Sequence, residues 1–314
     1  MRTAFLFPGQ GAQHVGMGRD LYGTFPAAKR VFDLAEEACG LPLKKLCFDG
    51  PAPELERTDI AQPAIFTVSA ATLAVMGDLL SPEQWEGIRP AFMAGLSLGE
   101  YTALYAADAV DLEAGVRLVA RRGQLMQEAA ARSPSGMVSI LGLDEQGAAE
   151  LCETAAQGQV LTCANFNCPG QVVLSGELEA CRRAGEMAKD RGAAGAVPLP
   201  VAGAFHSEIM RPAAETFRQA LEETEFHTPR VPVIANVDAA PHDGPQDIRS
   251  KLLAQLVSPV RWQQSMELLL AESVERFYEI GPGRVLTGLM RRIQRRTDCT
   301  CIHSMEAIEK LARD

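Results

Sequence analysis

The feature that most constrains the fold of this chain is the pentapeptide Gly95-Leu96-Ser97-Leu98-Gly99. A short apolar run precedes it, and a segment of helical character, 100–108, follows it. A G-x-S-x-G sequence between a strand and a helix is typical of a nucleophile elbow, a turn so tight that glycine is needed on both sides of the serine. The serine hydroxyl then lies at a helix N-terminus, whose free N–H groups suit a developing oxyanion. We predict that Ser97 is a nucleophile, against the alternative of an ordinary glycine-serine turn.

The loop after the first predicted strand is a second candidate. The strand covers residues 3–7, and Pro8-Gly9-Gln10-Gly11 follows it. The two glycines would let the backbone N–H of Gln10 approach a ligand just past a strand end, which is where α/β folds place their sites. A tight turn that merely joins the strand to a helix explains the same residues. Both interpretations stay open at this point.

A cation lies on the apolar side of the helix predicted at 111–130. Arg122 shares its face of that helix with Leu118 and Leu125. Burial of an unpaired guanidinium is costly, so we expect Arg122 to meet a carboxylate or a phosphate there. A ligand could supply this anion, and so could an internal salt bridge to Asp or Glu.

Among the five histidines, His206 has the most distinctive surroundings. It is preceded by Ala202-Gly203-Ala204-Phe205 and followed by Pro212. Because proline is favoured in the first turn of a helix, we expect His206 in the turn just before a helix. A general base and a buried structural histidine are both compatible with this position.

Composition narrows the class of protein. With 314 residues, of which 47% are hydrophobic and 22% charged, the chain can bury a large core. Its first apolar run is too short for a signal peptide, and no uncharged stretch reaches membrane-spanning length. The most apolar segment, 64–80, is expected to be a buried helix that opens at Pro63. The net charge of −10 argues against broad nucleic-acid binding, so we expect neither a nucleic-acid nor a membrane partner.

The cysteines indicate a reducing compartment. The chain has eight of them, with no C-x-x-C pair and no histidine at the spacing of a zinc ligand. Reduced core thiols in a cytoplasmic protein without a metal site are the expectation.

After residues 133–136 the pattern of the chain changes. The predicted order is strand 137–143, helix 145–157, strand 160–165, strand 171–175, helix 178–191 and strand 195–198. This β-α-β-β-α-β order is the ferredoxin-like split arrangement. We predict an α/β fold with a hydrolase-like large domain around a mainly parallel sheet, at 1–131 and 202–314, and an inserted ferredoxin-like subdomain at 132–201. The functional site should lie in the cleft between them.

Seven short motifs are spread in order over nearly the whole chain. They are FPGQGAQ at 7–13, GLSLGEY at 95–101, RRGQLMQ at 121–127, NFNCPGQVVLSG at 165–176, GAFHS at 203–207, SPVRW at 258–262 and EIGPG at 279–283. Taken together, they resemble the motifs of malonyl-CoA:acyl carrier protein transacylases. Each motif alone is weak, but seven in the right order are hard to obtain by chance.

The resemblance implies a role for each candidate residue. Ser97 would be the nucleophile and His206 its general base, the pairing that nucleophilic acyl transfer requires. In this family a backbone carbonyl orients the histidine, and the matching residue looks like Gln255. The backbone N–H groups of Gln10 and Leu98 would form the oxyanion hole.

The resemblance also supplies an anion for Arg122. This residue matches the family arginine that pairs with the free carboxylate of the malonyl group, which would discriminate against acetyl-CoA. Leu96 stands where many members carry histidine, which leaves the polarity of the pocket and the choice of extender unit open. Phe205, directly before His206, resembles the form in malonyl-selecting relatives rather than in methylmalonyl-selecting ones.

The implied reaction is a ping-pong transfer, without a cofactor, between malonyl-CoA and an acyl carrier protein of fatty-acid or polyketide synthesis. Malonyl-CoA acylates Ser97, CoA leaves, and the phosphopantetheine thiol of the carrier takes the malonyl group. An acidic carrier would need a local basic patch, for which the candidates are Arg291, Arg292, Arg295 and Arg296. A solvated helical face explains the same cluster. We expect the protein to be a monomer.

Two other functions could use the same residues. A serine thioester hydrolase would pass the acyl group from Ser97 to water, although an esterase for neutral acyl chains has no use for Arg122. A non-catalytic module that binds carrier proteins would be marked by the loss of Ser97 or His206, and both are present.

Three polar residues have no assigned role. Gln62, Asn165 and Asn167 could line the pocket or cap loops. Capping is favoured for Asn167, because it precedes Cys168-Pro169.

Overall fold

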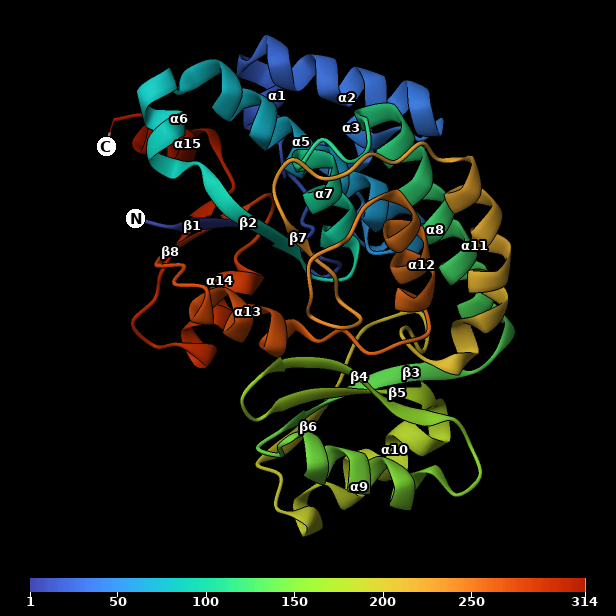
Figure 1. The fold of residues 1–314 in the computed structure, drawn as a ribbon. Helices are drawn as coiled ribbons and strands as arrows, with labels where there is room; N and C mark the ends of the chain where they lie inside the picture. The colour runs from blue at the N-terminus through green and yellow to red at the C-terminus, as the bar shows by residue number, and fades with distance from the viewer. Residues whose placement is uncertain (314) are drawn as a thin grey trace.

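The larger part of the molecule is built around a five-stranded parallel sheet (Figure 1). The structure is a computed structural model that describes residues 1–313. The strand order is β7-β2-β1-β8-β9, and every neighbouring pair is parallel. The strands are β1 (Thr3–Phe7), β2 (Pro90–Gly95), β7 (Val233–Ile234), β8 (Arg276–Ile280) and β9 (Asp298–Ile302).

Helices cover both faces of this sheet. Along β1, Phe5 and Phe7 pack into one apolar core, whereas Ala4 and Leu6 pack into another, because successive side chains of a strand point to opposite faces. The helices are α1 (Arg19–Thr24), α2 (Pro26–Cys39), α3 (Leu43–Asp49), α4 (Ala52–Leu55), α5 (Thr58–Leu79), α6 (Pro82–Ile88), α7 (Leu98–Ala106), α8 (Leu112–Arg132), α11 (Arg211–Glu223), α12 (Pro245–Gln255), α13 (Trp262–Ala271), α14 (Val285–Ile293) and α15 (Met305–Leu311). Coverage of both faces explains why every residue of β1 is buried.

Helix α5 runs through the middle of the larger core. By length and composition it could cross a membrane, but most of it is buried inside the fold, as expected for a core helix. The prediction that it opens at Pro63 is wrong, because it begins at Thr58. Its first turn is held by a bond from Ala61 N–H to Arg57 O (2.7 Å) and by one from Thr58 N–H to Gln127 Oε1 (3.1 Å). These bonds maintain the turn although proline contributes no N–H.

The smaller part is an antiparallel sheet with the order β4-β5-β3-β6. Its elements are β3 (Ser135–Leu141), α9 (Glu145–Ala156), β4 (Leu161–Cys168), β5 (Gln171–Glu177), α10 (Leu178–Met187) and β6 (Gly195–Pro198). Figure 1 shows both helices on the sheet face turned away from the larger part. A parallel sheet together with a separate split β-α-β-β-α-β sheet confirms the predicted fold class. The subdomain boundaries at 132 and 201 remain a prediction.

Backbone pairing joins the segment between α12 and α13, in the larger part, to strand β4 of the small sheet. Val260 N–H donates to Ala164 O (2.8 Å), and Phe166 N–H donates to Val260 O (2.9 Å). This parallel bridge lies opposite Asn165 in β4. The SPVRW motif therefore connects the larger part to the small sheet and places Asn165 where the two parts meet.

Candidate active site

Ser97 lies in a strained turn between β2 and α7. Its φ of 52° and ψ of −101° place it in a backbone region that L residues rarely adopt. A Cβ on Gly95 would overlap the backbone of Gly99, and a Cβ on Gly99 would overlap Phe7 O. Both glycines of the motif are thus required by close backbone approach, as a nucleophile elbow demands.

Asn236, which the sequence analysis did not select, holds the backbone of the elbow by two hydrogen bonds. Its Oδ1 accepts a bond from Ser97 N–H (2.7 Å), and its Nδ2 donates to Gly95 O (2.8 Å). Asn236 is buried and follows β7, the neighbour of β2 in the sheet. The available signal was a polar residue directly after the apolar run 231–235, at the end of a strand where α/β sites gather.

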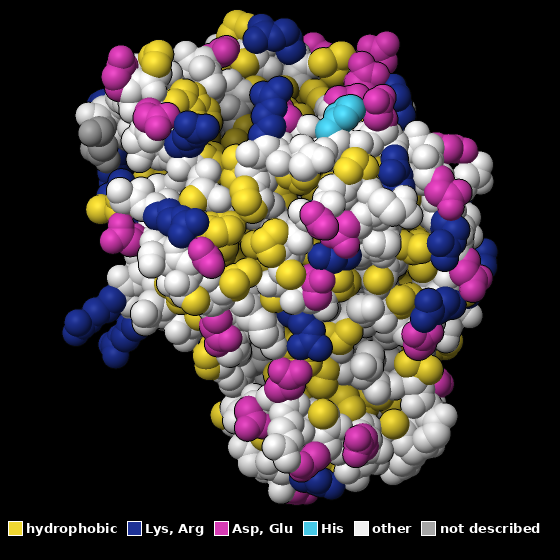
Figure 2. All heavy atoms as spheres, in the orientation of Figure 1, with side chains coloured by type: hydrophobic (Ala, Val, Ile, Leu, Met, Phe, Trp, Pro, Cys, Tyr) yellow, Lys and Arg dark blue, Asp and Glu magenta, His cyan; other side chains and the backbone are white. Residues whose placement is uncertain are grey.

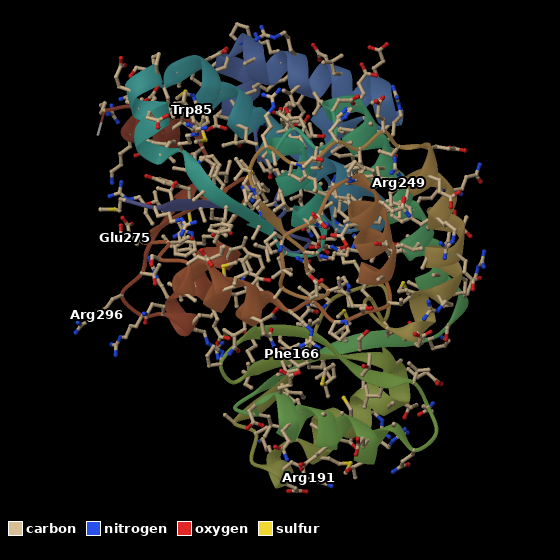
Figure 3. The ribbon with its side chains drawn as sticks, in the orientation of Figure 1. Trp85, Phe166, Arg191, Arg249, Glu275 and Arg296 are labelled. Carbon is tan, nitrogen blue, oxygen red and sulfur yellow. The ribbon has the colours of Figure 1, made fainter. Side chains whose placement is uncertain are left out.

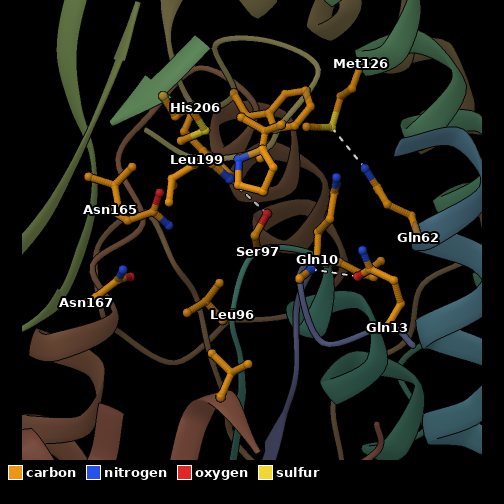
Figure 4. A pocket seen from close by; sticks show the side chains of 18 of the residues that line it. Gln10, Gln13, Gln62, Leu96, Ser97, Met126, Asn165, Asn167, Leu199 and His206 are labelled. Carbon is orange, nitrogen blue, oxygen red and sulfur yellow. Dashed lines mark hydrogen bonds between the residues drawn. The ribbon is translucent and has the colours of Figure 1, made fainter. Parts of the chain in front are cut away.

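The structure brings Ser97, His206 and Gln255 together. Ser97 Oγ lies 2.9 Å from His206 Nε2, and His206 Nδ1 lies 2.7 Å from the backbone oxygen of Gln255, the last residue of α12. His206 is buried and has a φ of 58°, in the short turn before α11. The acceptor at Nδ1 favours the tautomer in which Nε2 is free to accept a proton from Ser97. Figure 4 shows Ser97 next to His206, with a dashed line for the hydrogen bond between them.

The environment of His206 keeps it neutral. Burial of the imidazole, together with the positive charge of Arg122, lowers the pKa of His206 to about 4. The backbone acceptors of Gln255 and Ser258 act in the opposite direction but are outweighed. At neutral pH the ring can therefore act as a base.

Arg122 is buried beside the serine and has neutral partners only. Its Nη1 donates to Gln62 Oε1 (2.7 Å), and its Nη2 donates to Ser97 Oγ (3.0 Å) and to Gln255 Oε1 (2.8 Å). The guanidinium also lies over the ring of Tyr101, 5.2 Å from its centroid. Within residues 1–313 it forms no ion pair with Asp or Glu, so the internal salt bridge is the wrong interpretation. Burial lowers the pKa of Arg122, and a cation in this state attracts an anionic ligand.

Gln10 and Leu98 both face the cavity beside the serine. Gln10 follows β1 and Leu98 opens α7, so the two residues come from neighbouring strands. Neither backbone N–H donates to any other group in the described chain. Two such donors beside Ser97 suit the oxygen of an attacked carbonyl.

The cavity around Ser97 has a volume of about 410 Å³ and lies between the two sheets. The larger part contributes Leu96 and Gln62, the segment before α11 contributes Phe205, and the small sheet contributes Asn165 and Asn167. In Figure 4 the two asparagines lie across the pocket from Gln62. Asn167 Oδ1 has no hydrogen-bond partner within residues 1–313, so the favoured interpretation of this residue as a loop cap is wrong.

The donor groups of the described chain do not gather into a metal site. Over residues 1–313, no group of three or more His, Cys, Asp or Glu side chains is placed to hold a metal ion. The polar side chains that line the cavity beside Ser97 are amides, one imidazole, one guanidinium and the single carboxylate of Glu56. A neutral imidazole near a guanidinium suits acid-base chemistry on an anionic substrate.

A serine elbow that faces a histidine on an α/β scaffold is a common arrangement for acyl transfer. A model of the acyl transferase domain family matches residues 4–313 of the chain. The elbow, His206, Gln255 and the small sheet therefore all lie within one acyl transferase domain.

Individual relatives narrow this class. The chain is 44% identical to the malonyl CoA-acyl carrier protein transacylase of Bacillus subtilis (strain 168) over 309 residues. The aligned residues cover 98% of this chain and 95% of the relative. The transacylase structure from Coxiella burnetii has a TM-score of 0.95 and 39% identity, and covers 100% of this chain and 97% of the other. A malonyl-transacylase in complex with a type II PKS acyl-carrier protein has a TM-score of 0.91 and 39% identity. The match covers 100% of this chain and 99% of the other. This chain belongs to the family of malonyl CoA-acyl carrier protein transacylases.

Proposed function

We propose that the chain transfers a malonyl group from malonyl-CoA to the phosphopantetheine thiol of an acyl carrier protein, through a malonyl ester on Ser97. The observation that carries this proposal is the position of Ser97 Oγ, 2.9 Å from His206 Nε2 and 3.0 Å from Arg122 Nη2. A reactive hydroxyl thus lies between a base and a group that binds carboxylates. The names of the relatives support the same substrates.

In the first half-reaction His206 Nε2 takes the proton of Ser97 Oγ as the oxygen attacks the thioester carbonyl. The carbonyl oxygen becomes an oxyanion and accepts bonds from the N–H groups of Gln10 and Leu98. The carbon–sulfur bond then breaks, and CoA leaves as a thiol with the proton from His206. The product is the malonyl ester of Ser97, and electrons and protons balance.

The second half-reaction repeats these steps with another thiol. His206 takes the proton of the phosphopantetheine thiol, whose sulfur attacks the malonyl ester. The same two N–H groups stabilise the oxyanion, and Ser97 leaves with the proton from His206. Water in place of the thiol would give hydrolysis, so the site must favour the carrier over water.

Arg122 selects the acyl group. The free carboxylate of a malonyl group can replace the neutral acceptors of the guanidinium with a charged one, and charge-assisted bonds are roughly twice as strong as neutral ones. An acetyl group offers no such partner. Leu96 and Phe205 line the same pocket, and we propose that they bound the acyl group on its apolar side.

Intact-protein mass spectrometry tests the proposed function. The protein is mixed with malonyl-CoA and, in parallel, with acetyl-CoA and methylmalonyl-CoA. We expect a malonyl adduct that disappears when holo acyl carrier protein is added, with malonyl-carrier as the product. Free malonate without an adduct would favour a hydrolase, and no adduct with no turnover would favour a binding module.

The pH dependence of acylation should follow the lowered pKa of His206. The base must be neutral to accept a proton, so kcat/KM should rise as the pH increases through about 4 and stay level at neutral pH. In Arg122→Met the midpoint should move upward, because the positive charge that contributes to the lowered pKa is gone. A neutral ester such as p-nitrophenyl acetate is the suitable substrate, since it does not titrate. A midpoint near 6.5 in the unmodified protein would contradict the assignment.

The carrier should dock through part of the cluster of four arginines. On the face in Figure 2, basic and acidic side chains are interspersed and no broad basic surface is visible, which supports docking on a local group of basic residues. Arg292, on α14, donates to Gln171 Oε1 (3.0 Å), and Gln171 lines the cavity. Arg296 instead projects from the far edge of the molecule (Figure 3). We therefore propose a docking role for Arg292 and none for Arg296.

Charge reversal tests this division of the cluster. Arg292→Glu should raise the KM for the carrier about tenfold at low salt and leave acylation by malonyl-CoA unchanged, because docking precedes only the second half-reaction. Arg296→Glu carries the same change in charge and is the matched control. Equal effects of both variants on the carrier KM would mean that only net charge matters.

We further propose a cytoplasmic location and action as a monomer. All eight cysteines carry free thiols, and five of them are buried, which suits a reducing compartment. The contacts among Ser97, His206, Gln255 and Arg122 are complete within one chain, which supports action as a monomer.

A further inference from the structure

Glu100 is a buried carboxylate that the reaction described above does not use. It lies in the first turn of α7, three residues after Ser97, and its exposed fraction is 0%. Its Oε2 accepts bonds from Gln255 Nε2 (2.7 Å) and Asn236 N–H (3.0 Å), and its Oε1 lies 2.9 Å from His242 Nε2. Burial of a carboxylate is costly even with such partners, so its presence beside the elbow calls for a role beyond packing.

The bond to Gln255 fixes the orientation of that side-chain amide. Gln255 Nε2 points to Glu100 Oε2 and to Ser97 O (3.0 Å), so its Oε1 points to Arg122 Nη2 (2.8 Å). In the reversed amide, an NH₂ group would face the guanidinium and a carbonyl oxygen would face the carboxylate. Both contacts would be repulsive, so the charge of Glu100 selects the orientation in which Gln255 can accept from Arg122.

We propose that Glu100 is a positioning residue for malonyl selectivity, which acts through the side-chain amide of Gln255 to hold the Arg122 guanidinium where it receives the carboxylate of the acyl group. The inference rests on the proposed function, because it assigns a role toward the same substrate. Glu100 touches neither Ser97 Oγ nor Arg122 directly. Its negative charge nevertheless favours the cationic form of Arg122, against the effect of burial on the Arg122 pKa.

Gln255 makes two different contacts in the site, and the proposal concerns only one of them. The backbone oxygen of Gln255 holds His206, and its side-chain oxygen holds Arg122. A change at Glu100 should therefore disturb the bond from Arg122 to the Gln255 side chain and leave the bond between His206 and the Gln255 backbone oxygen intact. Selectivity between acyl groups is then the quantity that responds, rather than the general reactivity of Ser97.

Single-turnover acylation of Ser97 by malonyl-CoA and by acetyl-CoA measures this selectivity. In Glu100→Gln we expect the malonyl rate to fall about tenfold, because the charged acceptor of Gln255 becomes a neutral one. The acetyl rate should stay within about twofold, because acetyl does not use Arg122. Equal losses for both acyl groups would mean that Glu100 only supports the elbow, and no change in either rate would also overturn the proposal.

Gln255→Met gives a second route to the same result. Methionine keeps the backbone oxygen that holds His206 and removes the amide that links Glu100 to Arg122. We expect it to lose malonyl selectivity by at least as much as Glu100→Gln does. In the double variant, Glu100→Gln should cause no further loss, because its effect passes through the missing amide. Retained selectivity in Gln255→Met would overturn the proposal even where Glu100→Gln does not fold.

Glu279→Gln is the matched control. Glu279 is also fully buried, and its carboxylate accepts bonds from Leu286 N–H (2.9 Å) and Thr287 N–H (2.8 Å), away from Arg122. It should lower the thermal unfolding midpoint and leave the malonyl-to-acetyl ratio unchanged. If the unmodified protein took no malonyl group at all, the proposed function would fail together with this inference. Normal malonyl transfer with unchanged ratios in the variants would overturn this inference alone.

Discussion

Ser97→Ala should abolish malonyl transfer, with a loss in kcat on the order of 10⁴-fold or more. Among the described residues, no other hydroxyl contacts both His206 Nε2 and Arg122 Nη2. The methyl group of alanine cannot form an ester with the acyl group. The malonyl adduct seen by mass spectrometry should vanish with it. The elbow itself should persist, because Asn236 holds the backbone and not the hydroxyl.

Ser69→Ala is the control for the loss of a buried hydroxyl. Ser69 is fully buried in α5, and its Oγ has no hydrogen-bond partner in the described chain. Its replacement should leave malonyl transfer within about twofold of normal. A Ser97→Ala protein that still forms the adduct would show that another residue carries the acyl group.

Arg122→Met should lower acylation by malonyl-CoA on the order of 10²- to 10³-fold, because the malonyl carboxylate would be buried without its cation. Acylation by acetyl-CoA should fall far less, because acetyl has no carboxylate for the guanidinium to bind and loses only the bond from Arg122 to Ser97 Oγ. Parallel single-turnover measurements with the two thioesters give the ratio directly. The preference for malonyl over acetyl should be largely lost.

Arg121→Met serves as the comparison for this change. Arg121 is the preceding residue of α8, and its guanidinium bonds to Gln124 on the outer face of the helix. It should change neither rate by more than about twofold. A malonyl rate in Arg122→Met equal to that of Arg121→Met would exclude the proposed carboxylate contact.

Features that depend on neighbouring residues were predicted well from the sequence. The elbow requires glycine on both sides of Ser97, and the small sheet alternates strands and helices in a recognisable order, so both could be located from local patterns. Helical spacing also placed Arg122 correctly on the apolar, buried face of α8. Ends of elements were less accurate: β4 continues to Cys168, past the predicted end at 165.

The resemblance paired Ser97 with His206 and His206 with Gln255, but other partners that meet across long separations were not predicted. Asn236 reaches the elbow from 139 residues away, and Glu100 meets Gln255 across 155 residues. The local sequence places Asn236 after a strand and Glu100 in the first turn of a helix, but it does not show which distant groups they meet. Helical spacing could not decide between a salt bridge and a ligand for Arg122, since that depends on which acceptors the fold brings near the guanidinium.

The two backbone donors beside Ser97 depend on how two strands are aligned. Phe7 of β1 pairs with Gly95 of β2, and Leu96 N–H donates to Phe7 O (3.1 Å) just beyond this pair. Gln10 and Leu98 each lie three residues past the paired positions. The spacing between neighbouring strands, about 4.8 Å in any sheet, therefore sets the distance between the two N–H donors that would bind the oxyanion. Hydrogen exchange along β1 and β2 would report on catalytic geometry, because loosening of either strand would change the distance between the two donors.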